Sequence, residues 1–128
     1  IADVANGHQY GNNTVQASYR KIGKLVYICG IVITTTPPSS TPSGAVRMQG
    51  LPFSPSTAQA HCTGCISSGN AQGHSLGGDY TITMRVNQSD KIANLYKWSA
   101  TGGTTSLTAA EWLDAGEMQF GGTYITDL

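Results

Sequence analysis

The sharpest chemical signal in the sequence is a pair of cysteines with a histidine beside them. Cys62 and Cys65 have the Cys-x-x-Cys spacing found in zinc sites, His61 precedes them, and His74 lies further along the chain. Two thiolates and an imidazole are ligands that tetrahedral zinc accepts. However, a structural site usually has a second paired ligand element, and unpaired cysteines are often buried packing residues. We therefore expect no metal and no other cofactor, and these four residues are only weak zinc candidates.

Signatures of catalysis are missing from the sequence. There is no Gly-x-Ser-x-Gly elbow, no phosphate-binding glycine loop and no His-Glu-x-x-His. A Ser/His/Asp triad would need three residues brought together without any local signature. The carboxylates include no pair with the spacing of an acid–base couple: Asp79, Asp90, Glu111, Asp114, Glu117 and Asp127. We expect that the chain is not an enzyme.

Ligand binding has better candidates, because the expected loops carry aromatic and planar polar side chains. Carbohydrate sites combine rings that stack on sugars with a few polar groups that fix orientation. The candidates are Trp112, Asp114 and Glu117, with Tyr10 and His74 as further possibilities. Two interpretations of Trp112 stay open, since it either stacks on a ligand or anchors a helical turn onto the domain. Trp98, at the end of an expected strand, is equally open between core and ligand.

Composition narrows the class of protein. The chain has 128 residues and 39% hydrophobic content, which suits one domain with one core. Its net charge is zero and it has no basic run, so we expect no nucleic-acid partner. The longest apolar stretch, residues 25–33, is far shorter than the roughly 20 residues of a membrane span, so we expect no membrane insertion. Three cysteines argue against a disulfide framework and favour a reducing site of synthesis.

The elements that must position these residues are short strands. Runs of strand-forming residues alternate with Gly, Pro, Ser and Thr clusters, a pattern typical of an antiparallel β-sandwich. Residues 1–14 have no clear period and are expected to form an N-terminal arm or linker, and residues 15–128 the domain. We expect strands at residues 15–21, 24–34, 44–49, 59–67, 78–86, 91–99 and 122–126.

Turns and one helical segment complete the expected fold. The Lys-Ile-Gly-Lys sequence at 21–24 predicts a tight hairpin, and residues 100–104 predict another turn. The proline-rich residues 36–42 and the glycine-rich residues 69–78 are expected to be loops. Thr108 and Glu111 have the spacing of a capping box, which predicts one helical turn near residues 108–112.

The strand at residues 24–34 is apolar on both faces. Alternate residues of a strand point to opposite sides, so Val26, Ile28 and Val32 share one face. The other face carries Leu25, Tyr27, Cys29, Ile31 and Ile33. A two-layer sandwich covers only one face of each sheet, and no long helix is expected here. We expect a second subunit as the cover, with Val26, Ile28 and Val32 at the interface. The choice between the two faces is open, as is cover by the N-terminal arm.

Four segments of the sequence, residues 17–26, 44–53, 93–97 and 120–125, occur in a familiar order. They resemble the C-terminal receptor-binding or carbohydrate-binding domains of bacteriophage tail fibres and tailspikes, and the resemblance covers residue 15 to the end. Its most specific parts are Gly-Leu-Pro-Phe at 50–53 and Gly-Thr-Tyr-Ile at 122–125. The resemblance implies a jelly-roll-like β-sandwich, trimerisation about a fibre axis, and attachment to a host-surface glycan or another receptor.

The resemblance leads to one expected function and two alternatives. We expect a homotrimeric domain at the tip of a tail fibre or tailspike, made in the host cytoplasm and located in the virion. Its expected partner is a host-surface polysaccharide or another receptor. One alternative is a trimerisation or capping domain without a ligand. The other is an accessory carbohydrate-binding domain of a depolymerase. Glycan adsorption separates the structural alternative from the other two.

Overall fold

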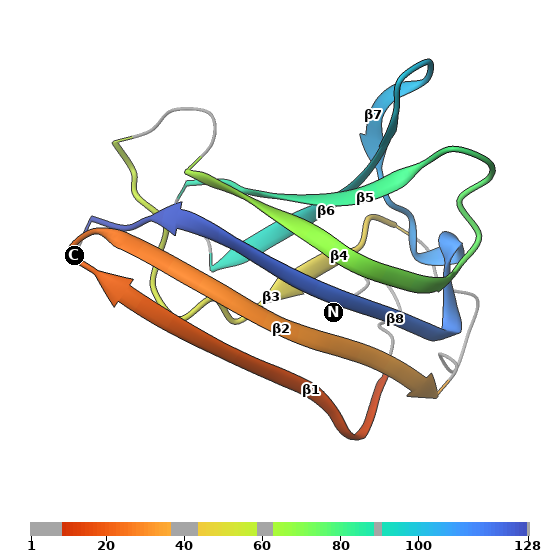
Figure 1. Ribbon diagram of the computed structural model, residues 1–128, viewed down its shortest axis with the longest axis horizontal. Helices are drawn as coiled ribbons and strands as arrows, with labels where there is room; N and C mark the ends of the chain where they lie inside the picture. The colour runs from red at the N-terminus through yellow and green to blue at the C-terminus, as the bar shows by residue number, and fades with distance from the viewer. Residues whose placement is uncertain (1–8, 37–43, 59–62, 89–90, 128) are drawn as a thin grey trace.

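The computed structural model describes residues 9–36, 44–58, 63–88 and 91–127 (Figure 1). Within these ranges the chain forms eight strands and one 3₁₀ turn. They are β1 (Gln9–Ile22), β2 (Leu25–Thr36), β3 (Arg47–Gln49), β4 (Gly64–His74), β5 (Thr81–Val86), β6 (Ile92–Ser99), β7 (Gly103–Ser106), η1 (Ala109–Glu111) and β8 (Trp112–Ile125).

All the strands belong to one curled antiparallel sheet. Its order is β1-β2-β8-β4-β5-β6-β3, and β7 pairs with β6. The sheet bends so that β1, β2, β8 and β4 form a front layer, while β5, β6 and β3 lie behind them (Figure 1). The predicted all-β, antiparallel sandwich is confirmed, and the jelly-roll connectivity stays a prediction.

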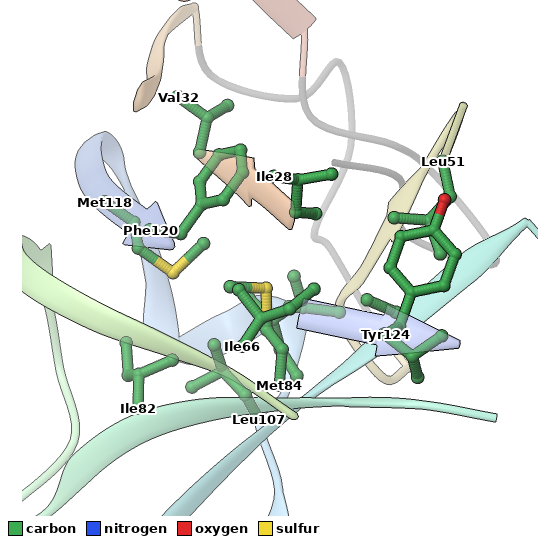
Figure 2. Close-up of a cluster of buried hydrophobic side chains, with 14 of the residues drawn as sticks. Ile28, Val32, Leu51, Ile66, Ile82, Met84, Leu107, Met118, Phe120 and Tyr124 are labelled. Atoms are coloured by element: carbon green, nitrogen blue, oxygen red, sulfur yellow. The ribbon is translucent and has the colours of Figure 1, made fainter. Parts of the chain in front are cut away.

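The hydrophobic core lies between the two layers (Figure 2). The front layer contributes Ile28, Ile66 and Met118, and β5 of the rear layer contributes Ile82 and Met84. Each of these side chains is at most 4% exposed. Burial of an aliphatic side chain of this size stabilises the fold by about 1.5–3 kcal/mol. The inward residues of each strand alternate with outward ones, and the outward residues form the surfaces described below.

The predicted turns have clear local causes. Gly23 adopts a φ of 57° in the β1–β2 hairpin, a conformation that glycine takes without strain. In the predicted helical segment, the Glu111 carboxylate accepts hydrogen bonds from the Thr108 backbone N–H at 2.9 Å and from its hydroxyl at 2.8 Å. The helical turn is therefore confirmed as η1. No helix among the described residues is long and apolar enough to cross a membrane.

Several predicted boundaries are wrong. β4 continues through the expected glycine loop to His74, and β8 begins ten residues before the expected strand at 122–126. The two long strands pair with each other, so tertiary hydrogen bonds override the weak strand propensity of glycine. Gly73 lies at a bulge in this pairing and has a φ of 71°. A side chain would not fit there, because a Cβ on Gly73 would lie 2.4 Å from the backbone oxygen of Ala115.

Other differences concern the ends of elements. β7 was not expected, because its sequence Gly-Thr-Thr-Ser carries no apolar residue and all four positions are exposed. β1 begins at Gln9, inside the segment assigned to an N-terminal arm. The expected loop at 36–42 begins where β2 ends, and residues 37–42 lie outside the described ranges.

Candidate functional site

The outer side of the front layer carries a stripe of apolar side chains, which we call the apolar face. Ile22, Leu25 and Ile125 stand directly opposite one another on β1, β2 and β8. They are 80%, 47% and 39% exposed, and Tyr27 beside them is 45% exposed. Half-buried residues extend the stripe along β2: Cys29, Ile31 and Ile33. Scattered exposed apolar residues are ordinary, but a row across three adjacent strands is typical of an interaction surface.

The structure corrects the choice of interface residues. Val26, Ile28 and Val32 are 0%, 4% and 3% exposed, because they point into the core of this same chain. They are therefore not available to a partner. The other side of β2 carries Leu25 and Tyr27, which are exposed in the single chain, and cover of that side by a second subunit stays a prediction.

Tyr27 itself adds no charge to the apolar face, although the exposed Arg20 stands directly opposite it on β1. The Tyr27 hydroxyl interacts with Cys29, and this hydrogen bond raises the pKa of Tyr27 above its usual value. The Cys29 thiol lies 3.2 Å from the Ser18 hydroxyl on β1. A phenol that keeps its proton adds no charge to desolvate when a partner covers it.

The outer side of the rear layer has a different chemistry, and we call it the aromatic face. Trp98 is 43% exposed at the centre of three strands, with Thr81 opposite it on β5 and Thr104 opposite it on β7. Tyr96 lies two residues away on the same side of β6. The remaining outward residues are polar: Thr83, Arg85, Asn94 and Ser106, with Arg47 on β3. Saccharide-binding sites combine aromatic rings, which stack on the sugar, with amide, hydroxyl and guanidinium groups, which form hydrogen bonds with its hydroxyls.

Arg85 and Tyr96 form an ordered pair on the aromatic face. The guanidinium lies over the tyrosine ring, 5.1 Å from its centre, and one nitrogen donates a hydrogen bond of 3.0 Å to the phenol oxygen. A hollow of about 160 Å³ opens beside them, and Thr83, Thr104 and Cys65 contribute to its wall. The contact holds the guanidinium in one orientation, so less side-chain entropy is lost when a ligand binds.

A second cavity opens on the core side, between β1 and the segment after β3. It has a volume of about 420 Å³, and its walls include Ile28, Leu51 and Phe120. None of its lining residues is charged, and most are aliphatic or aromatic. A saccharide buried there would leave many hydroxyls without partners, which costs free energy. The aromatic face fits a sugar better.

Trp112 is a packing residue in this structure. Its side chain is 1% exposed and its indole N–H donates a 2.8 Å hydrogen bond to the Thr34 hydroxyl. The His74 ring packs edge-on against it at 4.3 Å, and His74 Nε2 lies 3.1 Å from the Glu117 backbone oxygen. Burial lowers the pKa of His74 below its usual value. The prediction that Trp112 stacks on a ligand is wrong, and the alternative of an anchor beside the helical turn is correct.

Glu117 lies on the outer side of the front layer, away from the aromatic face. Its carboxylate accepts hydrogen bonds from Gln72 at 2.9 Å and from Asn70 at 3.3 Å, which joins β8 to β4. The Glu117 side chain remains partly exposed, and its role in ligand binding stays a prediction. The side chains of Tyr10 and Asp114 lie outside the described residues.

The zinc candidates do not come together within the described part of the chain. Cys65 and His74 lie near opposite ends of β4, about 30 Å apart along the strand at roughly 3.3 Å per residue. They cannot share one ion. His61 and Cys62 lie outside the described residues, and no group of three or more potential ligands occurs within them.

Comparison with known proteins provides one structural neighbour. The sequence matches no protein-family model and no curated protein. The crystal structure of the Dettilon tailspike protein is similar to this chain, with a TM-score of 0.78 and 12% sequence identity. The similarity covers 96% of this chain and 22% of the tailspike chain, so this chain corresponds to only part of that protein. At this level of identity the comparison shows a shared fold with part of a phage tailspike.

The sequence left Trp98 open between core and ligand, and the structure exposes it. The other residues of the aromatic face were not among the sequence candidates, although a signal for them exists. On β6 the buried residues Ala93 and Leu95 alternate with Asn94, Tyr96 and Trp98. Strict alternation therefore indicates that both aromatic residues point away from the core. The search for a binding residue in the expected loops favoured Trp112, whereas the exposed tryptophan is Trp98 on β6.

Proposed function

We propose that this chain is a domain of a bacteriophage tail fibre or tailspike that self-associates and binds a host-surface glycan without cleaving it. Its location would then be the virion tail. The fold shared with part of a tailspike supports the first element of the proposal. The contrast between the two outer faces carries the rest, because one exposes an apolar row that a protein partner would bury and the other suits a sugar.

The apolar face supports self-association. Ile22, Leu25, Tyr27 and Ile125 each expose between 39% and 80% of their surface in a single chain. Complete burial of such side chains is worth about 1.5–3 kcal/mol each, so covering the exposed part of all four gains several kcal/mol. Three copies arranged with their apolar faces toward a common axis would bury this surface and leave the three aromatic faces outward. A homotrimer is the arrangement we propose.

The aromatic face supports glycan binding. Trp98 offers an exposed ring on which the apolar side of a pyranose can stack, and flanking hydroxyls from Thr81 and Thr104 lie directly opposite it. These side chains project from hydrogen-bonded strands, so they are already positioned before a ligand binds. The chain is also rich in hydroxyl side chains and carries only 11% charged residues, which suits contact with sugars.

Reciprocal variants test the two halves of the proposal. Sedimentation velocity should give a particle of three times the chain mass, and Leu25→Asp should convert it to monomer. Trp98→Ala should leave the trimer intact but abolish adsorption to a panel of bacterial capsule and lipopolysaccharide polysaccharides, whereas Trp98→Phe should retain part of it. Circular dichroism controls for folding.

Each half of the proposal can be contradicted by a specific result. A monomeric unmodified protein would refute self-association. A stable trimer that adsorbs to none of the polysaccharides would leave only a structural trimerisation domain. Release of reducing ends from a bound polysaccharide would show that the domain is an enzyme.

A further inference from the structure

Two arginines flank one asparagine on the aromatic face. Arg47 on β3 stands opposite Asn94 on β6, and Asn94 stands opposite Arg85 on β5. Directly opposite residues of antiparallel strands project from the same side of the sheet. Adjacent strands are about 4.8 Å apart, so the row places two guanidinium groups on either side of an amide within roughly 10 Å at their roots.

These two cations have no carboxylate partner within the described residues. The ion pair that the structure shows there joins Lys97 to Glu111 instead. Arg85 uses one of its N–H groups on Tyr96, and a guanidinium has five. The Nε of Arg47 is buried without a hydrogen-bond partner among the described residues, so it cannot itself contact a surface ligand. The terminal N–H groups of the two guanidiniums are the donors that the row offers.

We propose that the aromatic face selects acidic saccharides, with the Arg47–Asn94–Arg85 row binding an anionic group of a sugar whose ring stacks on Tyr96 or Trp98. This inference rests on the proposed glycan binding and adds its specificity. A planar guanidinium forms paired, charge-assisted hydrogen bonds with a carboxylate or a phosphate. The Asn94 amide supplies a neutral donor and acceptor for a neighbouring hydroxyl.

The selectivity must come from this row, because the chain as a whole does not attract anions. Its net charge is zero, with seven basic and seven acidic residues. A polyanion without sugar rings would gain only the screened attraction of two surface cations. A polysaccharide with uronic acid or phosphate substituents would gain stacking and charge-assisted hydrogen bonds together.

Binding isotherms on paired polysaccharides test the inference. The probes are a uronic acid polymer and its carboxyl-reduced neutral form, a phosphate-bearing polysaccharide and its dephosphorylated form, and poly-glutamate as a sugar-free polyanion. We expect at least one acidic form to bind about tenfold more tightly than its neutral partner, and the ratio to fall as salt rises. The two pairs separate a carboxylate ligand from a phosphate ligand.

Matched variants assign the effect to the row. Arg85→Gln and Arg47→Gln should each reduce the acidic-to-neutral ratio toward one while the neutral form binds unchanged. Arg20→Gln removes the same charge from an exposed position on β1, across the sandwich, and should keep the ratio. Trp98→Ala should abolish binding of acidic and neutral forms alike.

The outcomes separate this inference from the proposed function. Equal binding of acidic and neutral forms, or a preference that survives both arginine variants, would overturn the inference and leave glycan binding intact. Tight binding of poly-glutamate would also overturn it, by showing non-specific anion attraction. Absence of binding by every polysaccharide would overturn the inference together with the proposed glycan function.

Discussion

Opposite faces of β2 should respond differently to truncation. Ile28 is 4% exposed and points into the core, so Ile28→Ala removes buried contacts and leaves a cavity. Substitutions of this kind cost about 2–5 kcal/mol of the free energy of unfolding. Leu25 is 47% exposed in the single chain, so Leu25→Ala should cost less than about 1 kcal/mol when no partner is bound.

Urea unfolding at two protein concentrations measures both effects. Association stabilises the folded state by mass action, so the midpoint of the unmodified protein should rise with concentration. Leu25→Ala should flatten that rise with little change at low concentration, whereas Ile28→Ala should lower both midpoints and keep the rise. Equal losses from the two substitutions at low concentration would refute the assignment of the inner and outer faces.

Three further predictions follow from local geometry. Gly122→Ala should destabilise the fold by about 2–3 kcal/mol, because a Cβ would lie 2.5 Å from the Cys65 oxygen, whereas Gly69→Ala meets nothing within 4 Å and should be nearly neutral in thermal unfolding. Burial lowers the pKa of His74, so the unfolded chain binds a proton at this residue more readily than the folded chain does. The free energy of unfolding should therefore fall as the pH drops below about 6.5. His74→Gln should remove this part of the pH dependence when unfolding is measured across a pH series. Hydrogen bonds from Ser56 and the Thr57 backbone lower the pKa of Asp127. The ionised carboxylate should therefore stabilise the fold above about pH 4, and this stabilisation should disappear in stronger acid. Acid unfolding of Asp127→Asn should lack this loss of stability.

Local patterns were sufficient for the fold class and for the turns. Gly23 in the first hairpin and Glu111 in the capping box act through neighbours in the sequence, so their positions could be predicted. The length of β4 could not, because residues such as Gly69 and Gly73 have low strand propensity and extend only through pairing with β8. That pairing joins residues that lie between 38 positions apart (His74 and Trp112) and 60 positions apart (Gly64 and Tyr124).

In the candidate site too, some features follow from the local sequence and others only from the tertiary fold. The need for cover on both sides of β2 follows from alternation, but which side faces the core depends on how the sheet curls. Trp112 was a fair candidate by residue type, and only the tertiary fold brings Thr34 and His74 onto it. The Arg47–Asn94–Arg85 row adds β3, which is distant in sequence, to the consecutive strands β5 and β6, so no local motif could indicate it.

Hydroxyl-radical footprinting of side chains tests most directly whether the two outer faces have separate roles. Raising the protein concentration should protect Leu25 and Tyr27 from oxidation and leave Trp98 reactive. Adding a polysaccharide that binds should protect Trp98 and Tyr96 and leave Leu25 and Tyr27 unchanged. Protection of Trp98 by self-association, or of Tyr27 by the polysaccharide alone, would contradict the division of the surface into an assembly face and a glycan face.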